Sequence, residues 1–130
     1  MIVLDASALI DLLLRSAGAE AIEERVFARG ESLHAPHLID LEVAQVLRRY
    51  RLVSEISDRR AEEVFNDLAD MPLNRYPHDV LLPRIWELRN SATAYDAAYL
   101  ALAEALDAPL LTRDRCLAVS RGHRVKIEVV

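Results

Sequence analysis

The sequence predicts an α/β fold in which a parallel sheet is covered by helices on both faces. Short apolar segments that suit buried strands alternate along the chain with longer segments of helical spacing. The 130 residues are the usual size of one domain, and 52% of them are hydrophobic, so the chain can bury a core. No run of Gly or Pro suggests a linker. We therefore expect a single domain over residues 1–130.

Five short apolar segments are the expected strands. Each is followed by a polar residue, a Pro or the start of a helical pattern. One of them, Leu73–Tyr76, is expected at an edge of the sheet. The five segments are Met1–Leu4, Ser32–Ala35, Leu73–Tyr76, Pro109–Thr112 and Val125–Val130.

Helices are expected between and after these strands. The first runs through Leu14 with Ser7 as a plausible cap, and a helix starting at Ser57 carries acids in its first turns, which suits the helix dipole. Pro83 is tolerable near the start of its helix. The remaining expected helices cover about 19–28, 38–50, 79–89, 93–107 and 114–120.

Composition gives only weak hints about partners. The formal net charge of −5 argues mildly against a general nucleic-acid binder. The basic residues are nevertheless almost all Arg, with Lys126 the single Lys, and Arg suits bidentate contacts to phosphate or carboxylate. The single Cys116 excludes an internal disulfide and is expected to be a small buried hydrophobe. Asp5 and Asp11 interrupt the hydrophobic N-terminus, which lacks a leading basic region, so we expect a cytoplasmic protein.

Four carboxylates stand in positions that are unusual for surface residues. Asp5 directly follows the first expected strand, and Asp114 follows the fourth. Glu42 has apolar residues at three of the four positions that lie three and four residues away, so it faces inward. Asp96 lies in the first turn of a helix whose following residues are almost all apolar. Open α/β sheets bind ligands beyond the carboxyl ends of their strands, so the four acids are candidates for one site.

Each acid taken alone also has a purely structural interpretation. Any of the three aspartates could cap a helix, whereas Glu42 on an apolar helix face would need a partner. Two carboxylates about 4 Å apart repel by about 4 kcal/mol at an effective dielectric near 20, so four converging ones require a cation. An all-oxygen set with the hydroxyls of Ser7 and Thr112 nearby suits Mg²⁺ or Mn²⁺. This chemistry favours metal-assisted attack of water on a phosphodiester.

A metal site built from Cys or His is not expected. There is no Cys cluster and no His pair at a metal-binding spacing. The four histidines are expected at the surface: His34, His37, His78 and His123.

Four segments follow one another along the chain: VLDASALIDLLL, APHLIDLEVAQVLRR, NSATAYDAAYLALAEAL and APLLTRDRCLAV. They resemble the successive motifs of PIN-domain ribonucleases, and most closely the VapC-type toxins of bacterial toxin–antitoxin pairs. No single motif is specific, but the four occur in the order of the family and span nearly the whole chain.

The resemblance implies a three-layer α/β/α PIN-like domain with a parallel five-stranded sheet. It implies that the catalytic and metal-binding acids are Asp5, Glu42, Asp96 and Asp114. Asp5 and Asp96 look like the best direct ligands of Mg²⁺ or Mn²⁺, and the other two acids would ligate the metal or orient water. Thr112 would be the hydroxyl that precedes the last acid. The activity implied is cleavage of RNA by a metal-activated water.

The resemblance also implies partners. VapC-like toxins form homodimers and are inhibited by a cognate antitoxin that covers the active-site groove. Apolar residues on the helices of Ile22–Phe27 and Val43–Leu52 suit either such a groove or the core. Four arginines could contact RNA phosphates or antitoxin carboxylates, or belong to a solvated face. They are Arg48, Arg49, Arg113 and Arg115.

Three other functions are compatible with an α/β fold of this size. A non-catalytic PIN-fold module that binds RNA or protein would be expected to lack at least one of the four acids, and none is missing. A haloacid-dehalogenase-type phosphatase would need a second Asp two residues after Asp5, where the chain has Ser7. A receiver domain would need paired acids near the first strand and a Lys after a late strand, and neither is found.

Overall fold

Five strands form one sheet in the order β3-β2-β1-β4-β5, and all neighbouring strands are parallel. The computed structural model describes all residues 1–130. Each strand is short because a helix or turn begins where its apolar segment ends. The strands are β1 (Ile2–Leu4), β2 (Leu33–Pro36), β3 (Leu73–Tyr76), β4 (Leu110–Thr112) and β5 (Ile127–Val129). The predicted parallel five-stranded sheet, with Leu73–Tyr76 at an edge, is confirmed.

Seven α-helices connect and cover these strands. The expected helix at 79–89 begins instead as a 3₁₀ turn, η1 (Asp79–Leu81), and continues as a short α-helix whose second residue is Pro83. The α-helices are α1 (Ala6–Leu14), α2 (Ala19–Val26), α3 (Leu38–Leu52), α4 (Asp58–Asp70), α5 (Leu82–Glu87), α6 (Ala94–Leu106) and α7 (Arg115–Ala118). None of them has the length and hydrophobicity that a bilayer crossing requires.

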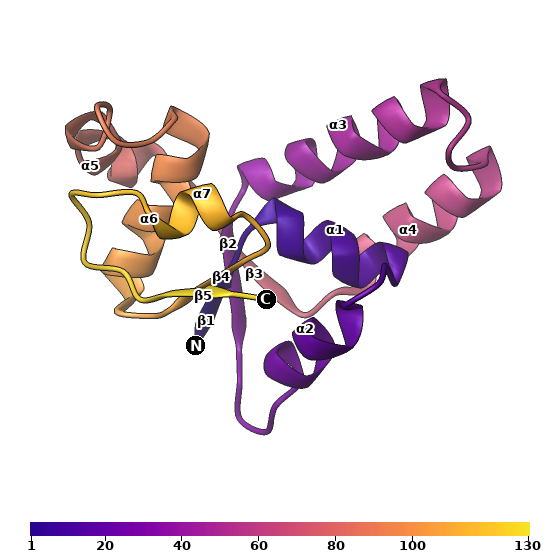
Figure 1. Cartoon of the computed structure of the whole chain (residues 1–130), viewed down its shortest axis with the longest axis horizontal. Coiled ribbons are helices and arrows are strands. Elements are labelled where there is room, and N and C mark those ends of the chain that lie inside the picture. The colour runs from indigo at the N-terminus through magenta and orange to yellow at the C-terminus, as the bar shows by residue number, and fades with distance from the viewer.

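The helices form a layer on each side of the sheet (Figure 1). Helices α5, α6 and α7 lie on one side, and α1 and α2 lie on the other, while α3 and α4 form a hairpin that projects away from the sheet. Helix α6 packs on β1, β2 and β4, and every residue from Ala97 to Ala103 is buried. Its small Ala side chains allow close approach to the strands. The three-layer α/β/α arrangement is therefore the one predicted.

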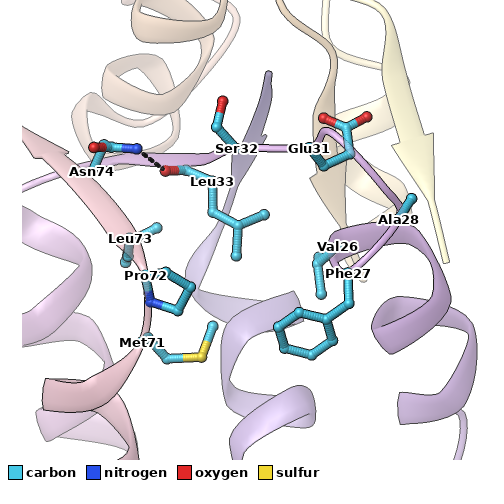
Figure 2. A pocket seen from close by; sticks show the side chains of 10 residues that line it. All are labelled: Val26, Phe27, Ala28, Glu31, Ser32, Leu33, Met71, Pro72, Leu73 and Asn74. Atoms are coloured by element: carbon cyan, nitrogen blue, oxygen red, sulfur yellow. Dashed lines mark hydrogen bonds between the residues drawn. The ribbon is translucent and has the colours of Figure 1, made fainter.

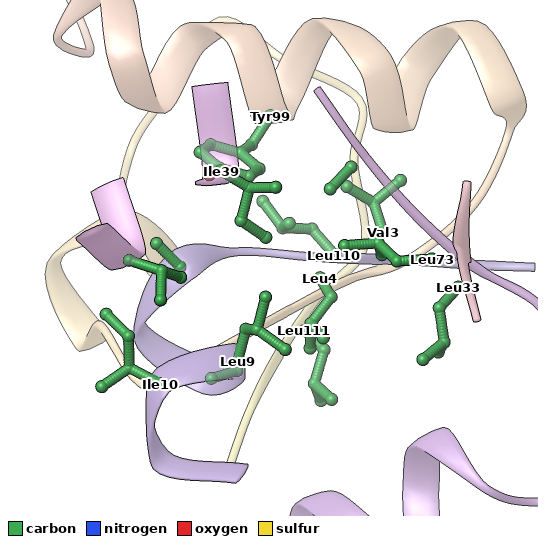
Figure 3. Packing of buried hydrophobic residues seen from close by; sticks show 14 of the residues in the cluster. Val3, Leu4, Leu9, Ile10, Leu33, Ile39, Leu73, Tyr99, Leu110 and Leu111 are labelled. Atoms are coloured by element: carbon green, nitrogen blue, oxygen red, sulfur yellow. The ribbon is translucent and has the colours of Figure 1, made fainter. Parts of the chain in front are cut away.

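The core fills the space on both faces of β1 and β4. Figure 3 shows Leu4 and Leu111 of the sheet between Tyr99 on one side and Leu9 on the other. All four of these side chains are less than 3% exposed. Burial of the central strands on both faces explains why their sequences are continuous apolar runs.

Three local predictions were wrong. Cys116 is exposed, because α7 is a single turn and Leu117 is its one buried residue. His34 is buried, because β2 is covered on both faces, and its ring nitrogens bond to the hydroxyls of Ser32 and Tyr76. Ser7 does not cap α1; the capping side chain is that of Asp5.

Candidate active site

The four acids singled out in the sequence line one cavity of about 670 Å³ at the carboxyl ends of the strands. Asp5 follows β1 and Asp114 follows β4, which is the neighbour of β1, with Leu4 paired to Leu111. From β1 the chain continues to β2 on one side, while β4 lies on the other, so the cavity lies at the point where the strand order reverses. Glu42 enters from α3 and Asp96 from the first turn of α6.

Asp5 is the most rigidly held of the four acids. It is 7% exposed, and its Oδ1 accepts the backbone N–H of Ala8 at 3.0 Å and the hydroxyl of Ser7 at 2.7 Å. Its Oδ2 accepts the hydroxyl of Thr112. Asp5 therefore caps α1 and also lines the cavity, so the two interpretations left open by the sequence hold together.

The hydroxyls of Ser7 and Thr112 connect Asp5 to the turn that carries Asp114. The hydroxyl oxygen of Ser7 accepts the backbone N–H of Arg113 at 3.0 Å, and that of Thr112 accepts the N–H of Asp114 at 2.9 Å. Each hydroxyl thus donates to Asp5 and accepts from the 113–114 backbone. Together they fix the ends of β1 and β4 relative to each other.

Replacing Thr112 by Val is expected to lower the free energy of unfolding by about 1–3 kcal/mol, because buried hydrogen-bonding groups lose their partner. Val has nearly the shape of Thr, and position 112 is fully buried, so packing is conserved. Urea denaturation at neutral pH measures the loss. Thr112→Ser restores the hydroxyl and should recover most of it. Equal stability of wild type and Thr112→Val would show that the hydroxyl does not hold Asp5 in place.

Glu42 and Tyr99 form the link between α3 and α6. The Tyr99 hydroxyl donates to Oε1 of Glu42 at 2.7 Å. Burial raises the pKa of Glu42, the Tyr99 hydrogen bond opposes this, and the charges of Asp5 and Asp96 raise it further. Burial also raises the pKa of Tyr99, so its phenol keeps the proton that it donates.

Asp96 and Asp114 differ in their local roles. The side chain of Thr93 caps α6 by accepting the N–H of Asp96 at 3.1 Å, so Asp96 is not the capping residue of its helix. Burial raises the pKa of Asp96, and the charges of Asp114 and Asp5 raise it further. Asp114 is exposed and caps α7, its Oδ1 accepting the N–H of Cys116 at 2.8 Å.

The four acids of the cavity have no ion-pair partner in the protein. None of the four acids forms an ion pair with an Arg, a Lys or the N-terminal amine. The pKa of Asp5, like that of Glu42 and Asp96, is raised mainly by burial and in part by the charge of a neighbouring acid. Eight other acids do form ion pairs: Asp11, Glu31, Asp40, Asp58, Glu63, Glu87, Glu104 and Glu128.

The donor set fits a divalent cation. It is composed of carboxylate oxygens in a partly buried pocket of negative charge, which is the chemistry that Mg²⁺ and Mn²⁺ prefer. As the side chains stand, no three His, Cys, Asp or Glu residues are close enough to share one ion. Mg²⁺ usually keeps several waters and takes only one or two protein carboxylates, so a closed cage is not required.

A second cavity, of about 560 Å³, lies at the amino ends of β2 and β3 and has a different character (Figure 2). Its lining is mostly apolar, with Val26, Leu33 and Met71 among the residues drawn. Its one ionisable residue, Glu31, forms an ion pair with Arg25 and another with the N-terminal amine. This cavity has no group of acids without ion-pair partners, so the candidate active site is the cavity at the carboxyl ends of the strands.

Comparison with known proteins agrees with the geometry of the site. The sequence model of the PIN domain family matches residues 2–119. The chain belongs to the PIN-domain family. It is 44% identical to Ribonuclease VapC1 of Mycobacterium tuberculosis over 129 residues, which are 98% of this chain and 96% of that protein. It is 41% identical to Ribonuclease VapC12 of the same species over 130 residues, covering 100% of this chain and 99% of the relative.

A solved structure shares the fold at low sequence identity. A chain in the crystal structure of VapBC2 from Rickettsia felis, bound to a DNA fragment from their promoter, superimposes with a TM-score of 0.73 at 12% identity. The match covers 99% of this PIN domain and 98% of that chain. At this identity the likeness supports the fold alone. The family and the fold predicted from the sequence are thus confirmed.

The four predicted arginines of this PIN domain have different surroundings. Arg49 lines the cavity with the acids. Arg113 forms an ion pair with Asp11 at 2.7 Å and donates to the Val130 carbonyl at 2.7 Å, which gives it a structural role. Arg48 and Arg115 are exposed and do not line the cavity. Contact of these side chains with RNA or antitoxin stays a prediction.

The sequence did not lead us to place Tyr99 in the site or to predict the ion pair between Asp11 and Arg113. A buried phenol three residues after Asp96 was the available signal for the first, because residues three apart share a helix face. The second had no signal in the sequence, since Asp11 and Arg113 lie on different elements.

Proposed function

We propose that this PIN domain is a Mg²⁺-dependent endoribonuclease that acts as the toxin of a toxin–antitoxin pair in the cytoplasm. The observation that carries the proposal is the cavity at the strand ends, where four acids converge and none of them forms an ion pair with an Arg, a Lys or the N-terminal amine. The ribonuclease names of relatives at 41–44% identity over nearly the whole chain support RNA as the substrate.

The acids have separate roles in this proposal. Asp5 and Asp96 hold the metal, because they are the two aspartates of the cavity that are buried or half-buried, one directly after β1 and the other in the first turn of α6. Glu42 and Asp114 complete the ligand set or orient water by accepting its protons. When bound, Mg²⁺ supplies charge neutralisation and activation of water for attack on the phosphodiester, and Mn²⁺ can substitute. Ser7 and Thr112 keep Asp5 aligned.

The wall of the same cavity suits a protein inhibitor. Leu38, Leu41 and Val46 of α3 and Tyr95 of α6 lie beside the acids, and Leu41 is 75% and Tyr95 66% exposed. A cognate antitoxin segment with apolar side chains and a basic residue would cover this wall and pair with the acids, excluding RNA. The other apolar residues considered for a groove are mostly core, since Ile22 and Val43 are fully buried. A homodimer is proposed on the family resemblance alone.

Cleavage assays with purified protein test the proposal. The protein should cut RNA in Mg²⁺ or Mn²⁺ and lose activity in EDTA, and sequencing of RNA 5′ ends after induction in cells should reveal discrete cleavage sites. Cleavage that continues unchanged in EDTA would contradict the metal-dependent mechanism. Binding of RNA without any cleavage, together with no detectable Mn²⁺ binding by calorimetry, would support the non-catalytic module instead.

A further inference from the structure

The hydroxyl of Tyr99 is buried beneath the active-site acids although the core does not need it. Tyr99 is 2% exposed, and its neighbours in sequence, Ala98 and Leu100, are buried and apolar. Phe would fill the same space without a polar atom to satisfy, whereas a buried phenol requires a partner. That partner is Oε1 of Glu42, at 2.7 Å.

This hydrogen bond joins α3, which carries Glu42, to α6, which carries Tyr99. Glu42 lies near the start of α3, whose far end projects from the body of the domain with α4 (Figure 1). Tyr99 lies three residues after Asp96 on α6, the buried helix, so both residues occupy one face of a rigid element. The bond therefore fixes the position of Glu42 relative to α6, the helix that also carries Asp96.

The phenol of Tyr99 is an uncharged hydrogen-bond donor to Glu42. A phenol donates a hydrogen bond without bringing a positive charge, so it orients Glu42 and leaves the charge of the carboxylate for a cation. The bond occupies Oε1, and Oε2 makes no hydrogen bond within the protein. An Arg or Lys in place of Tyr99 would hold Glu42 but would neutralise it.

We infer that Tyr99 is a positioning residue of the active site, which fixes Glu42 in the orientation that serves the divalent cation. The inference rests on the proposed function. It assigns to α6 two tasks, the supply of Asp96 and the alignment of Glu42.

Titration with Mn²⁺ followed by calorimetry tests this role independently of cleavage. Tyr99→Phe should weaken Mn²⁺ binding by about tenfold, the usual lower range for loss of a residue that orients a metal ligand. Glu42→Gln should weaken it as well, and the double variant should be no weaker than Glu42→Gln alone, because Tyr99 acts through Glu42. In cleavage assays at fixed Mg²⁺, Tyr99→Phe should lower kcat and leave KM for RNA nearly unchanged.

Tyr76→Phe is the matched control. Its hydroxyl bonds to the buried His34 at 2.6 Å, but Tyr76 does not line the active-site cavity. Like Tyr99→Phe, it removes a tyrosine hydroxyl that forms one side-chain hydrogen bond, but it should bind Mn²⁺ like the wild type. Wild-type affinity in Tyr99→Phe, or additive losses in the double variant, would overturn the inference alone. A wild-type protein that neither binds Mn²⁺ nor cleaves RNA would overturn the proposed function, and the inference with it.

Discussion

Asp96→Asn is expected to lower RNA cleavage by at least about a thousandfold, because a lost metal ligand removes several kcal/mol of transition-state stabilisation and each 1.36 kcal/mol is a factor of ten in rate. The substitution keeps the size of the side chain and removes its charge. Single-turnover cleavage at saturating Mg²⁺ measures the effect. Full activity in this variant would contradict the assignment of Asp96 to the metal site.

The loss should not result from unfolding. The side chain of Thr93 caps α6, and the helix is anchored by its apolar residues from Ala97 to Ala103, so Asp96 has no essential structural role. Because the substitution removes only the negative charge of Asp96, the melting temperature of Asp96→Asn in EDTA should equal or exceed that of the wild type. Asp67→Asn, at an exposed position of α4 that forms no ion pair, is the matched control and should retain both activity and stability.

The difference in stability between Asp96→Asn and wild type in EDTA should depend on pH. The folded-state pKa of Asp96 is raised above 3.8, first by burial and then by the charges of Asp114 and Asp5. An acid whose pKa is raised on folding destabilises the fold where it is ionised, and this effect disappears as the pH falls through the folded-state pKa. The advantage of Asp96→Asn over wild type should therefore be largest near neutral pH and shrink in acid. An advantage that grew as the pH fell would exclude like-charge repulsion as its cause.

The order of elements and the gathering of the four acids in one cavity could be predicted because both depend on local patterns. Apolar runs show where β1 and β4 end, and in a parallel sheet those ends meet at one edge, so Asp5 and Asp114 could be brought together without coordinates. Glu42 was recognised by the apolar residues around it on one helix face. In each case the informative neighbours lie within a few positions in the sequence.

The remaining features depend on distances that the sequence does not encode locally. Tyr99 bonds to Glu42 across 57 positions, and this requires the rotation of both helices about their axes to be known. Whether Asp5 caps a helix or lines a site could not be decided from the sequence, since the structure shows that one carboxylate does both. The arginines were the least predictable, because a long side chain such as that of Arg113 reaches whichever acid its neighbouring elements present.

Mn²⁺ is expected to stabilise the folded wild-type protein strongly. A ligand that binds only the folded state adds about 2.7 kcal/mol to the free energy of unfolding when present at a hundred times its dissociation constant. For a domain of this size the addition corresponds to a rise in melting temperature of roughly 10 °C. The physical reason is that the cation both gains ligands and relieves the repulsion among buried carboxylates. Differential scanning fluorimetry with and without Mn²⁺ measures the shift, and EDTA should reverse it.

Three controls separate binding at this site from other effects of the salt. NaCl at the same ionic strength screens charges without coordinating carboxylates, so it should give only a small part of the shift. Asp67→Asn should show the full rise, since it lies outside the cavity. Asp96→Asn should show almost none, because its site has lost a ligand and part of the repulsion that the cation relieves. An equal rise in Asp96→Asn and in wild type would place the stabilising cation elsewhere on the molecule and contradict its binding by the four acids.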